Sequence, residues 1–173
     1  MHTHPAPAGV PDAETQRAFA LIKSLGGAWQ GLVTEPTNKL KVTMDVSLRV
    51  TSRGNAVVHE MKSAEATDNP VKNDHPVTMM YLDGAKLLLT HYCDAGNRPR
   101  MVGRVSPDGK VIDFDFLDIT GSTEYGHMQH ATFTLIDATH HIEDWTYEAA
   151  SGKTVNGHFD LKRVADVATV TSR

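Results

Sequence analysis

The feature that most constrains this chain is a two-residue alternation of apolar and polar side chains that returns many times along it. Met44, Val46, Leu48 and Val50, for example, are separated by polar residues. Because successive side chains of a β-strand point to opposite faces, this period is typical of a strand that is buried on one face only. An amphipathic α-helix would repeat its apolar residues every three or four positions. The chain is therefore predicted to consist mainly of β-strands.

Turn signals separate the alternating stretches and set their order. Asp83-Gly84, residues 107–109 (PDG) and residues 151–153 (SGK) each join two stretches in the manner of a hairpin. The expected strands are residues 28–34, 44–50, 56–62, 77–82, 85–93, 100–105, 110–117, 131–135, 141–148 and 154–161. Strands that follow one another without intervening helices form a meander, and closure of the meander removes its exposed edges. We predict an all-β fold, a closed antiparallel up-and-down β-barrel of about nine to ten strands.

One helix is predicted ahead of the strands, with Asp12 as its N-cap and an apolar stripe over residues 18–25. We expect a flexible lead-in over residues 1–11, a single barrel domain over residues 12–165 and a tail over residues 166–173. The lead-in lacks the charged and apolar regions of an intact signal peptide. A cytoplasmic protein and a periplasmic or secreted protein that has lost its signal both remain open. The stretches 67–76 and 120–129 are expected to be loops at the barrel mouth.

Composition excludes several classes of function. The 173 residues carry a formal net charge of −4, which argues against a nucleic-acid partner because binding phosphates needs a basic face. No apolar run is long enough to form a membrane-spanning helix. The single cysteine, Cys93, has no internal partner for a disulfide. Motifs of serine hydrolases, P-loop enzymes and zinc proteases are absent, and no metal site is expected.

Residues 27–31 (GAWQG) follow the helix and open the first strand. This segment resembles the start of the calycin superfamily, which includes the lipocalins, the fatty-acid-binding proteins and the nitrobindin-like haem proteins. The resemblance implies that Trp29 closes one end of the barrel beside the helix. After Gly31 the chain has Leu32-Val33 where nitrobindin has a further glycine, and this departure weakens the inference of haem binding.

A second resemblance lies in residues 91–93 (HYC) and residues 96–101 (GNRPRM). These segments look like a group of lipocalin-like bacterial proteins that share a His-Tyr-Cys…Gly-Asn-x-Pro-Arg signature. The likeness runs from about residue 19 to residue 163 and supports the barrel. It implies no particular activity, because a shared fold does not transfer function.

Two side chains of the stretch 85–93 are candidates for a site inside the barrel. His91 and Cys93 share a face with leucines and are expected to point inward. Arg98 and Arg100 follow in the next hairpin, and an arginine near the mouth would bind an acidic ligand. His91 is compatible with contact to a ligand, with a haem ligand, with a general base and with a buried histidine of purely structural role.

Other candidates come from neighbouring strands. His59 shares a face with Val57 and Met61, so it points inward or lies at the rim. Glu143, Trp145 and Tyr147 share one face, and burial of the aromatic rings would bring the carboxylate inside. A buried Glu143 beside His91 or Arg100 would mark a site, whereas an exposed Glu143 would lie at the strand end. Met101, Phe114 and Phe116 are expected to contribute apolar lining.

Two further histidine pairs are interpreted as less informative. His127 and His130 are three residues apart, and side chains at that spacing on a strand face opposite ways, so they do not form a metal site by themselves. His127 is placed in a mouth loop. His140 and His141 follow a turn and are expected to be solvated.

Together these features favour the binding of a small apolar or amphipathic, possibly acidic, ligand inside the barrel. One alternative is an enzyme, an isomerase or hydrolase of a small organic substrate, with His91 as general acid or base and Arg100 or Tyr147 stabilising an oxyanion. Another is haem bound through His91 or His59. A filled barrel would instead indicate a structural role, and a homodimer through one barrel wall stays open.

Overall fold

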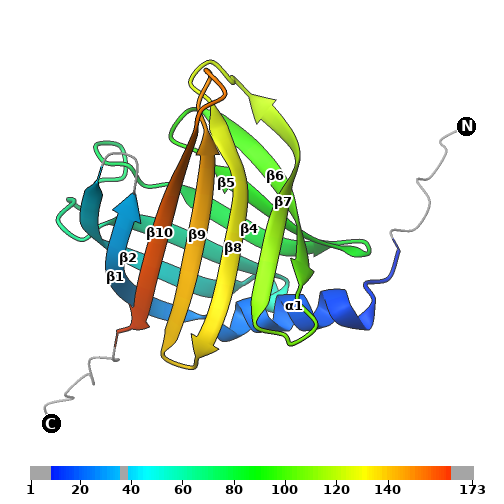
Figure 1. Ribbon diagram of the computed structural model, residues 1–173. Coiled ribbons are helices and arrows are strands. Elements are labelled where there is room, and N and C mark those ends of the chain that lie inside the picture. The colour runs from blue at the N-terminus through cyan, green and yellow to red at the C-terminus, as the bar shows by residue number, and fades with distance from the viewer. Residues whose placement is uncertain (1–8, 36–38, 165–173) are drawn as a thin grey trace, which may run out of the picture.

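The computed structural model describes residues 9–35 and 39–164 and shows one β-sheet that closes on itself (Figure 1). Except for residues 9–11, the predicted lead-in and tail lie outside the described residues. The strands are β1 (Gly27–Glu35), β2 (Leu40–Thr51), β3 (Ala56–Ser63), β4 (Val77–Asp83), β5 (Lys86–Tyr92), β6 (Asn97–Val105), β7 (Val111–Gly121), β8 (His127–Asp137), β9 (His140–Glu148) and β10 (Thr154–Arg163). The prediction of a closed antiparallel barrel with one N-terminal helix is confirmed.

Each strand pairs with its neighbours in the chain, and β1 pairs with β10 to complete the barrel. Trp29 lies opposite Arg163 in this last pairing, and Thr34 lies opposite His158. At Gly31 the two strands approach so closely that a Cβ atom would lie 1.8 Å from the carbonyl oxygen of Asp160. The second glycine of the GAWQG segment is therefore required by the contact between the first and last strands.

The helix α1 (Ala13–Ser24) covers one end of the barrel (Figure 1). The Asp12 side chain caps it by accepting a hydrogen bond from the Thr15 amide. Its buried residues, Ala18, Phe19 and Ile22, share one face, which packs against β5, β6 and β2. The helix is too short to span a membrane, and the described residues contain no helix long and apolar enough to do so.

Trp29 fills the barrel end beside the helix. It is 1% exposed, and its indole Nε1 donates a hydrogen bond to the Leu25 carbonyl at 2.8 Å. The Arg163 guanidinium lies over the ring, 4.1 Å from its centroid. The position expected for Trp29 from the calycin resemblance is therefore the position that it has.

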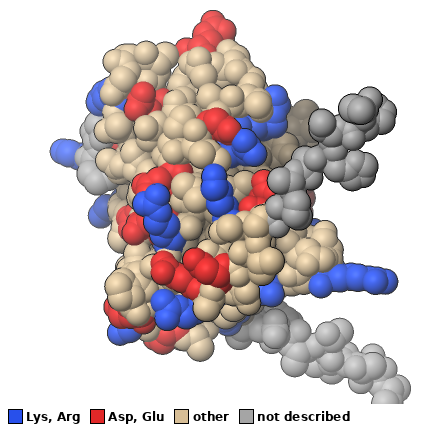
Figure 2. All heavy atoms as spheres, turned by 90° about the vertical axis from the view of Figure 1, so that its right-hand side faces the viewer, with Lys and Arg blue, Asp and Glu red and all other residues tan. Residues whose placement is uncertain are grey.

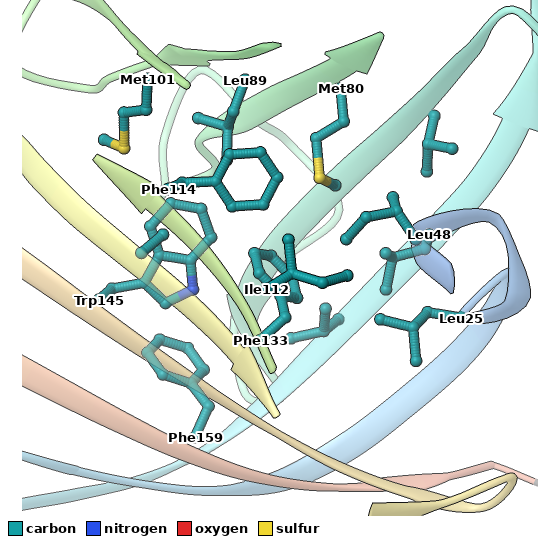
Figure 3. Packing of buried hydrophobic residues seen from close by; sticks show 14 of the residues in the cluster. Leu25, Leu48, Met80, Leu89, Met101, Ile112, Phe114, Phe133, Trp145 and Phe159 are labelled. Carbon is teal, nitrogen blue, oxygen red and sulfur yellow. The ribbon is translucent and has the colours of Figure 1, made fainter. Parts of the chain in front are cut away.

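Apolar side chains fill the barrel from this end to its middle. Figure 3 shows aromatic, methionine and leucine side chains converging from several strands. Phe133 contacts both Phe114 and Trp145, with ring centroids 5.8 Å apart in each pair. On the outside, Figure 2 shows acidic and basic side chains interspersed over one face of the molecule.

The predicted loop at residues 120–129 is shorter in the structure. Strand β7 continues to Gly121 because it pairs with β6, and β8 begins at His127 because it pairs with β9. His127 is thus the first residue of a strand, where its ring lies 5.0 Å from that of Phe116. Its placement in a mouth loop was wrong. The long connection between β3 and β4, which contains residues 67–76, is confirmed as non-strand structure.

Candidate functional site

A cavity of about 700 Å³ lies at the end of the barrel opposite the helix. It is lined by the mouth-side ends of several strands and by the connections after β3 and β5. Its lining residues are Val33, Val42, Met44, Met61, Ser63, Ala66, Asn73, Asp74, Pro76, His91, Cys93, Asp94, Ala95, Met128, Tyr147 and Phe159. Three methionines and a phenylalanine give it an apolar and adaptable surface. Its size lies within the range of small-molecule sites in proteins.

His91 is the most deeply buried polar side chain in this lining. It is 1% exposed, and its Nδ1 lies 2.8 Å from the hydroxyl oxygen of Thr78, which is itself fully buried. Burial, with a smaller contribution from the nearby charge of His59, lowers the pKa of His91 to about 4. The imidazole is therefore neutral at pH 7.

The Thr78 hydroxyl determines which nitrogen of His91 carries the proton. Among the described residues, His91 Nδ1 is the only hydrogen-bond partner of this hydroxyl. A buried hydroxyl that cannot donate its proton is costly, so Thr78 donates and Nδ1 accepts. The proton of the neutral ring is then on Nε2, which makes no hydrogen bond to the described residues and, unlike Nδ1 of His59 or His141, is not shut off from open space. His91 thus presents an N–H donor to the cavity.

The other titratable groups of the cavity are neutral or acidic. Burial raises the pKa of the Cys93 thiol, and burial also raises the pKa of Tyr147, whose hydroxyl donates to the Tyr125 carbonyl at 2.6 Å. Asp74 and Asp94 lie exposed at the rim, and Asp94 accepts a hydrogen bond from the His75 amide. Burial, together with the Asp74 charge, raises the pKa of Asp94. No lysine or arginine belongs to the described lining.

A second polar cluster is enclosed in the barrel and centred on Glu143 of β9. His59 Nε2 and Trp145 Nε1 each donate to its Oε2 atom at 2.9 Å, and His141 Nε2 donates to its Oε1 atom at 2.9 Å. Glu143 and both histidines are fully buried. Burial alone would raise the pKa of Glu143, but the His59 charge and the hydrogen bonds from the two histidines outweigh it and hold that pKa well below its usual range. The carboxylate is ionised and receives three N–H donors.

Trp145 connects the enclosed cluster to the cavity. Its ring centroid lies 5.6 Å from that of His59 and 5.4 Å from that of His91. Because Glu143 accepts a hydrogen bond from the indole N–H of Trp145, the carboxylate fixes the orientation of the Trp145 ring, which packs against His91. The Nδ1 atoms of His59 and His141 have no hydrogen-bond partner among the described residues. Within residues 9–35 and 39–164, no three His, Cys, Asp or Glu side chains are arranged to hold a metal ion.

The structure separates the predicted site residues into three groups. His91, Cys93 and Tyr147 line the cavity. His59, Met101, Phe114, Glu143 and Trp145 point inward but are packed in the filled part of the barrel. Phe116 is half-buried beside His127, outside the cavity lining.

Arg100 is placed differently from the prediction. Its guanidinium lies on the outer face, 40% exposed, and pairs with Asp118. The reason is strand alternation: the next residue, Met101, is fully buried, so both cannot face inward. Arg98 is also exposed and donates to Thr120. Neither arginine therefore belongs to the cavity lining, where an anchor for an acidic ligand was predicted.

Sequence reasoning missed His141 and Thr78. His141 was expected to be solvated with His140, but it is fully buried, while His140 pairs with Asp160 on the outside. The signal was available, because His141 precedes Glu143 by two residues and so shares its face. Thr78 carried no such signal, since a threonine within a strand is ordinary.

The residues of the His-Tyr-Cys…Gly-Asn-x-Pro-Arg pattern have separate structural roles. Gly96 has a φ of 81°, which favours glycine in the turn after β5. Asn97 is buried, and its amide donates to the carbonyls of Ser122 and Gly126, so it joins this turn to the β7–β8 loop. Of the signature residues, only His91 and Cys93 belong to the cavity lining.

Comparison with solved structures identifies the fold. The chain is similar to Rv2717c from M. tuberculosis, with 14% identity and a TM-score of 0.65 over 86% of this chain and 98% of that protein. It is also similar to the S-type phycobiliprotein lyase CpeS from Guillardia theta, with 11% identity and a TM-score of 0.58 over 90% and 99% of the two chains. The fold is that of a lipocalin-like barrel.

A third similar structure is a protein of unknown function from the DUF3598 family of Nostoc punctiforme. It has 11% identity and a TM-score of 0.55 over 83% of this chain and 49% of that protein. No protein-family model matches the lipocalin-like chain, and no curated protein matches it significantly. At these identities the solved structures show the fold alone.

Proposed function

We propose that this lipocalin-like barrel binds a small amphipathic molecule in the cavity at its open end. The observation that carries the proposal is the cavity itself, which is mostly apolar and has the neutral His91 ring in its wall. A barrel filled along its whole length would leave no such space. Apolar lining supplies affinity, and a few placed polar groups orient the ligand.

The protonation states of the cavity favour binding over acid–base catalysis. His91 is neutral with its proton on Nε2, so it offers a donor and no basic lone pair to the cavity. Burial raises the pKa of Cys93, which keeps the thiol protonated, and a nucleophilic cysteine needs the opposite shift. The Tyr147 hydroxyl donates its hydrogen bond to the Tyr125 carbonyl. None of these groups is arranged as an activated nucleophile or a general base.

The same protonation states bear on haem, which would need a lone pair on the histidine that binds iron. Thr78 donates to Nδ1 of His91, and this bond leaves Nε2 protonated. His59 is fully buried, and its Nε2 donates to Glu143. Neither histidine therefore fits haem iron as arranged.

A homodimer through one barrel wall remains a prediction.

The proposal is tested by titrating the protein with a neutral amphipathic probe, 2-acetylnaphthalene, which has one ketone oxygen, and following binding by isothermal titration calorimetry. Val42→Trp places a large ring in the cavity, whereas Thr43→Trp places the same ring on the outer face of β2. We expect Val42→Trp to weaken binding at least about fivefold and Thr43→Trp to leave it unchanged. Equal binding by all three proteins, or no binding by the unmodified protein, would contradict the proposal. Native mass spectrometry of freshly purified protein then gives the mass of any retained ligand.

A further inference from the structure

We infer that the ligand of this cavity carries a neutral hydrogen-bond acceptor, a ketone, aldehyde, ester or amide oxygen, that accepts a hydrogen bond from Nε2–H of His91. The inference rests on the proposed function and assigns the polar end of the ligand. It depends on one polar atom and on the charges around it.

The polar atom is the Nε2–H group of His91. The ring is held on one side by the hydrogen bond from Thr78 and packs against Trp145 on another, so its direction is fixed.

Two other donors of the lining are engaged within the protein: the Tyr147 hydroxyl donates to the Tyr125 carbonyl, and the Asn73 amide donates to the carbonyls of Thr67 and Asn69. The Ser63 hydroxyl, which accepts from the Glu65 amide, lies on the connection side of the lining and is not fixed in direction as the His91 ring is. A ligand without an acceptor would remove water from Nε2–H and leave it unsatisfied. A site of this kind discriminates against such ligands, because an unpaired buried donor is costly.

The surrounding charges exclude an anionic acceptor. A carboxylate drawn into the apolar cavity would lose its hydration, and the described lining holds no lysine or arginine to replace it. Asp74 and Asp94 add negative charge at the rim. His91 does not supply a positive charge either, because its pKa is lowered to about 4. A neutral carbonyl oxygen obtains the hydrogen bond from His91 without the cost of burying a charge.

Three probes of similar shape separate these possibilities. 2-Acetylnaphthalene carries a ketone oxygen, 2-ethylnaphthalene is its counterpart without oxygen, and 2-naphthoate is its anionic counterpart. Each is titrated at pH 7 into the unmodified protein and into His91→Leu. His91→Leu removes the donor but keeps an apolar side chain of similar bulk. Thr78→Val, nearly the same shape as threonine, removes only the hydroxyl that holds the proton on Nε2.

We expect His91→Leu to weaken the binding of 2-acetylnaphthalene about tenfold and not to weaken that of 2-ethylnaphthalene, which no longer leaves a donor unpaired. Thr78→Val should give a smaller loss in the same direction. 2-Naphthoate should bind the unmodified protein at least about tenfold more weakly than 2-acetylnaphthalene. Nitrogen-15 NMR of the imidazole gives a readout that does not depend on affinity: the protonated nitrogen of His91 should be Nε2 in the unmodified protein.

Failure of the inference and failure of the proposed function have different signatures. If 2-ethylnaphthalene binds but His91→Leu lowers the affinity for all three probes equally, the cavity binds ligands and the inference is overturned. The same follows if 2-naphthoate binds most tightly, or if Nδ1 carries the proton. If none of the probes binds the unmodified protein, the proposed function fails and the inference falls with it.

Discussion

The two halves of the barrel interior hold their polar groups in opposite ways. In the filled half, the Glu143 carboxylate is enclosed by His59, His141 and Trp145, and each of these donates a hydrogen bond to it. In the hollow half, one nitrogen of His91 is engaged by Thr78 while the other faces the cavity. The enclosed carboxylate makes its hydrogen bonds inside the protein, and the unpaired Nδ1 atoms of its two histidines are buried outside the cavity lining, so this cluster offers nothing to a ligand. A polar group with one bond left to make is available to a ligand.

The largest test of this comparison removes the carboxylate. Glu143→Ala leaves three buried N–H donors without an acceptor, so we expect a loss of about 3–5 kcal/mol in the free energy of unfolding. Glu143→Gln keeps one acceptor oxygen and should lose less. Urea unfolding followed by circular dichroism measures both. Asp118→Ala is the control, since it removes an exposed carboxylate and should cost less than about 1 kcal/mol. Equal effects of Glu143→Ala and Asp118→Ala would contradict a structural role for the enclosed cluster.

The two halves of the barrel are expected to affect the free energy of unfolding over different pH ranges. His91 has a folded pKa of about 4 against an ordinary value of 6.5, so below pH 6.5 the unfolded chain binds a proton that the folded protein does not. Stability is therefore expected to fall by roughly 3 kcal/mol as the pH drops from 6.5 to 4. Glu143 has a depressed pKa, so its contribution is present above its ordinary value of 4.5 and is lost only at lower pH.

Urea unfolding at a series of pH values measures how the free energy of unfolding changes over these two pH ranges. His91→Leu should flatten the dependence between pH 6.5 and pH 4 and leave the steeper loss at lower pH. An unchanged profile in this variant would show that His91 does not stay neutral in the folded protein.

A matched pair of substitutions measures the packing of the two halves. Val57 is fully buried in the filled half, and Val42 lines the cavity. Val57→Phe adds volume where there is no space and should cost about 1–3 kcal/mol in the free energy of unfolding. Val42→Phe adds the same volume to open space and should cost less than about 0.5 kcal/mol, by the same reasoning. Similar losses in thermal or urea unfolding for the two variants would mean that the cavity is not open in solution.

A small effect on stability and none on binding are expected of Arg100→Met. The Arg100–Asp118 pair is partly exposed on the outer face, so its loss should cost less than about 1 kcal/mol. Binding of 2-acetylnaphthalene should be unchanged, because Arg100 is not part of the cavity. A tenfold loss of probe affinity without loss of stability would show that Arg100 contributes to ligand binding.

Alternation in the sequence predicted which way side chains point, but not how deep along the barrel they lie. It assigned His59, His91, Glu143 and Trp145 to faces that they share with apolar residues, with the rim still open for His59 and Glu143, and all four side chains are buried. It left open whether Glu143 lies at the rim or in the centre, because strand period carries no information on position along the barrel axis. His141 and Trp145 lie on β9 with Glu143, but His59 comes from β3, so its contact with Glu143 depends on the closure of the barrel.

The pairing of the first strand with the last has a consequence for the order of assembly during synthesis. Arg163 of β10 hydrogen-bonds to the carbonyl of Gly26, a contact that spans 137 residues. At ribosomal rates of about 5–20 residues per second, β1 waits several seconds or longer with an unpaired edge before its partner exists. Contacts of such long range also slow folding once the chain is complete. The newly made protein therefore passes through a period in which chaperones have an open strand to protect.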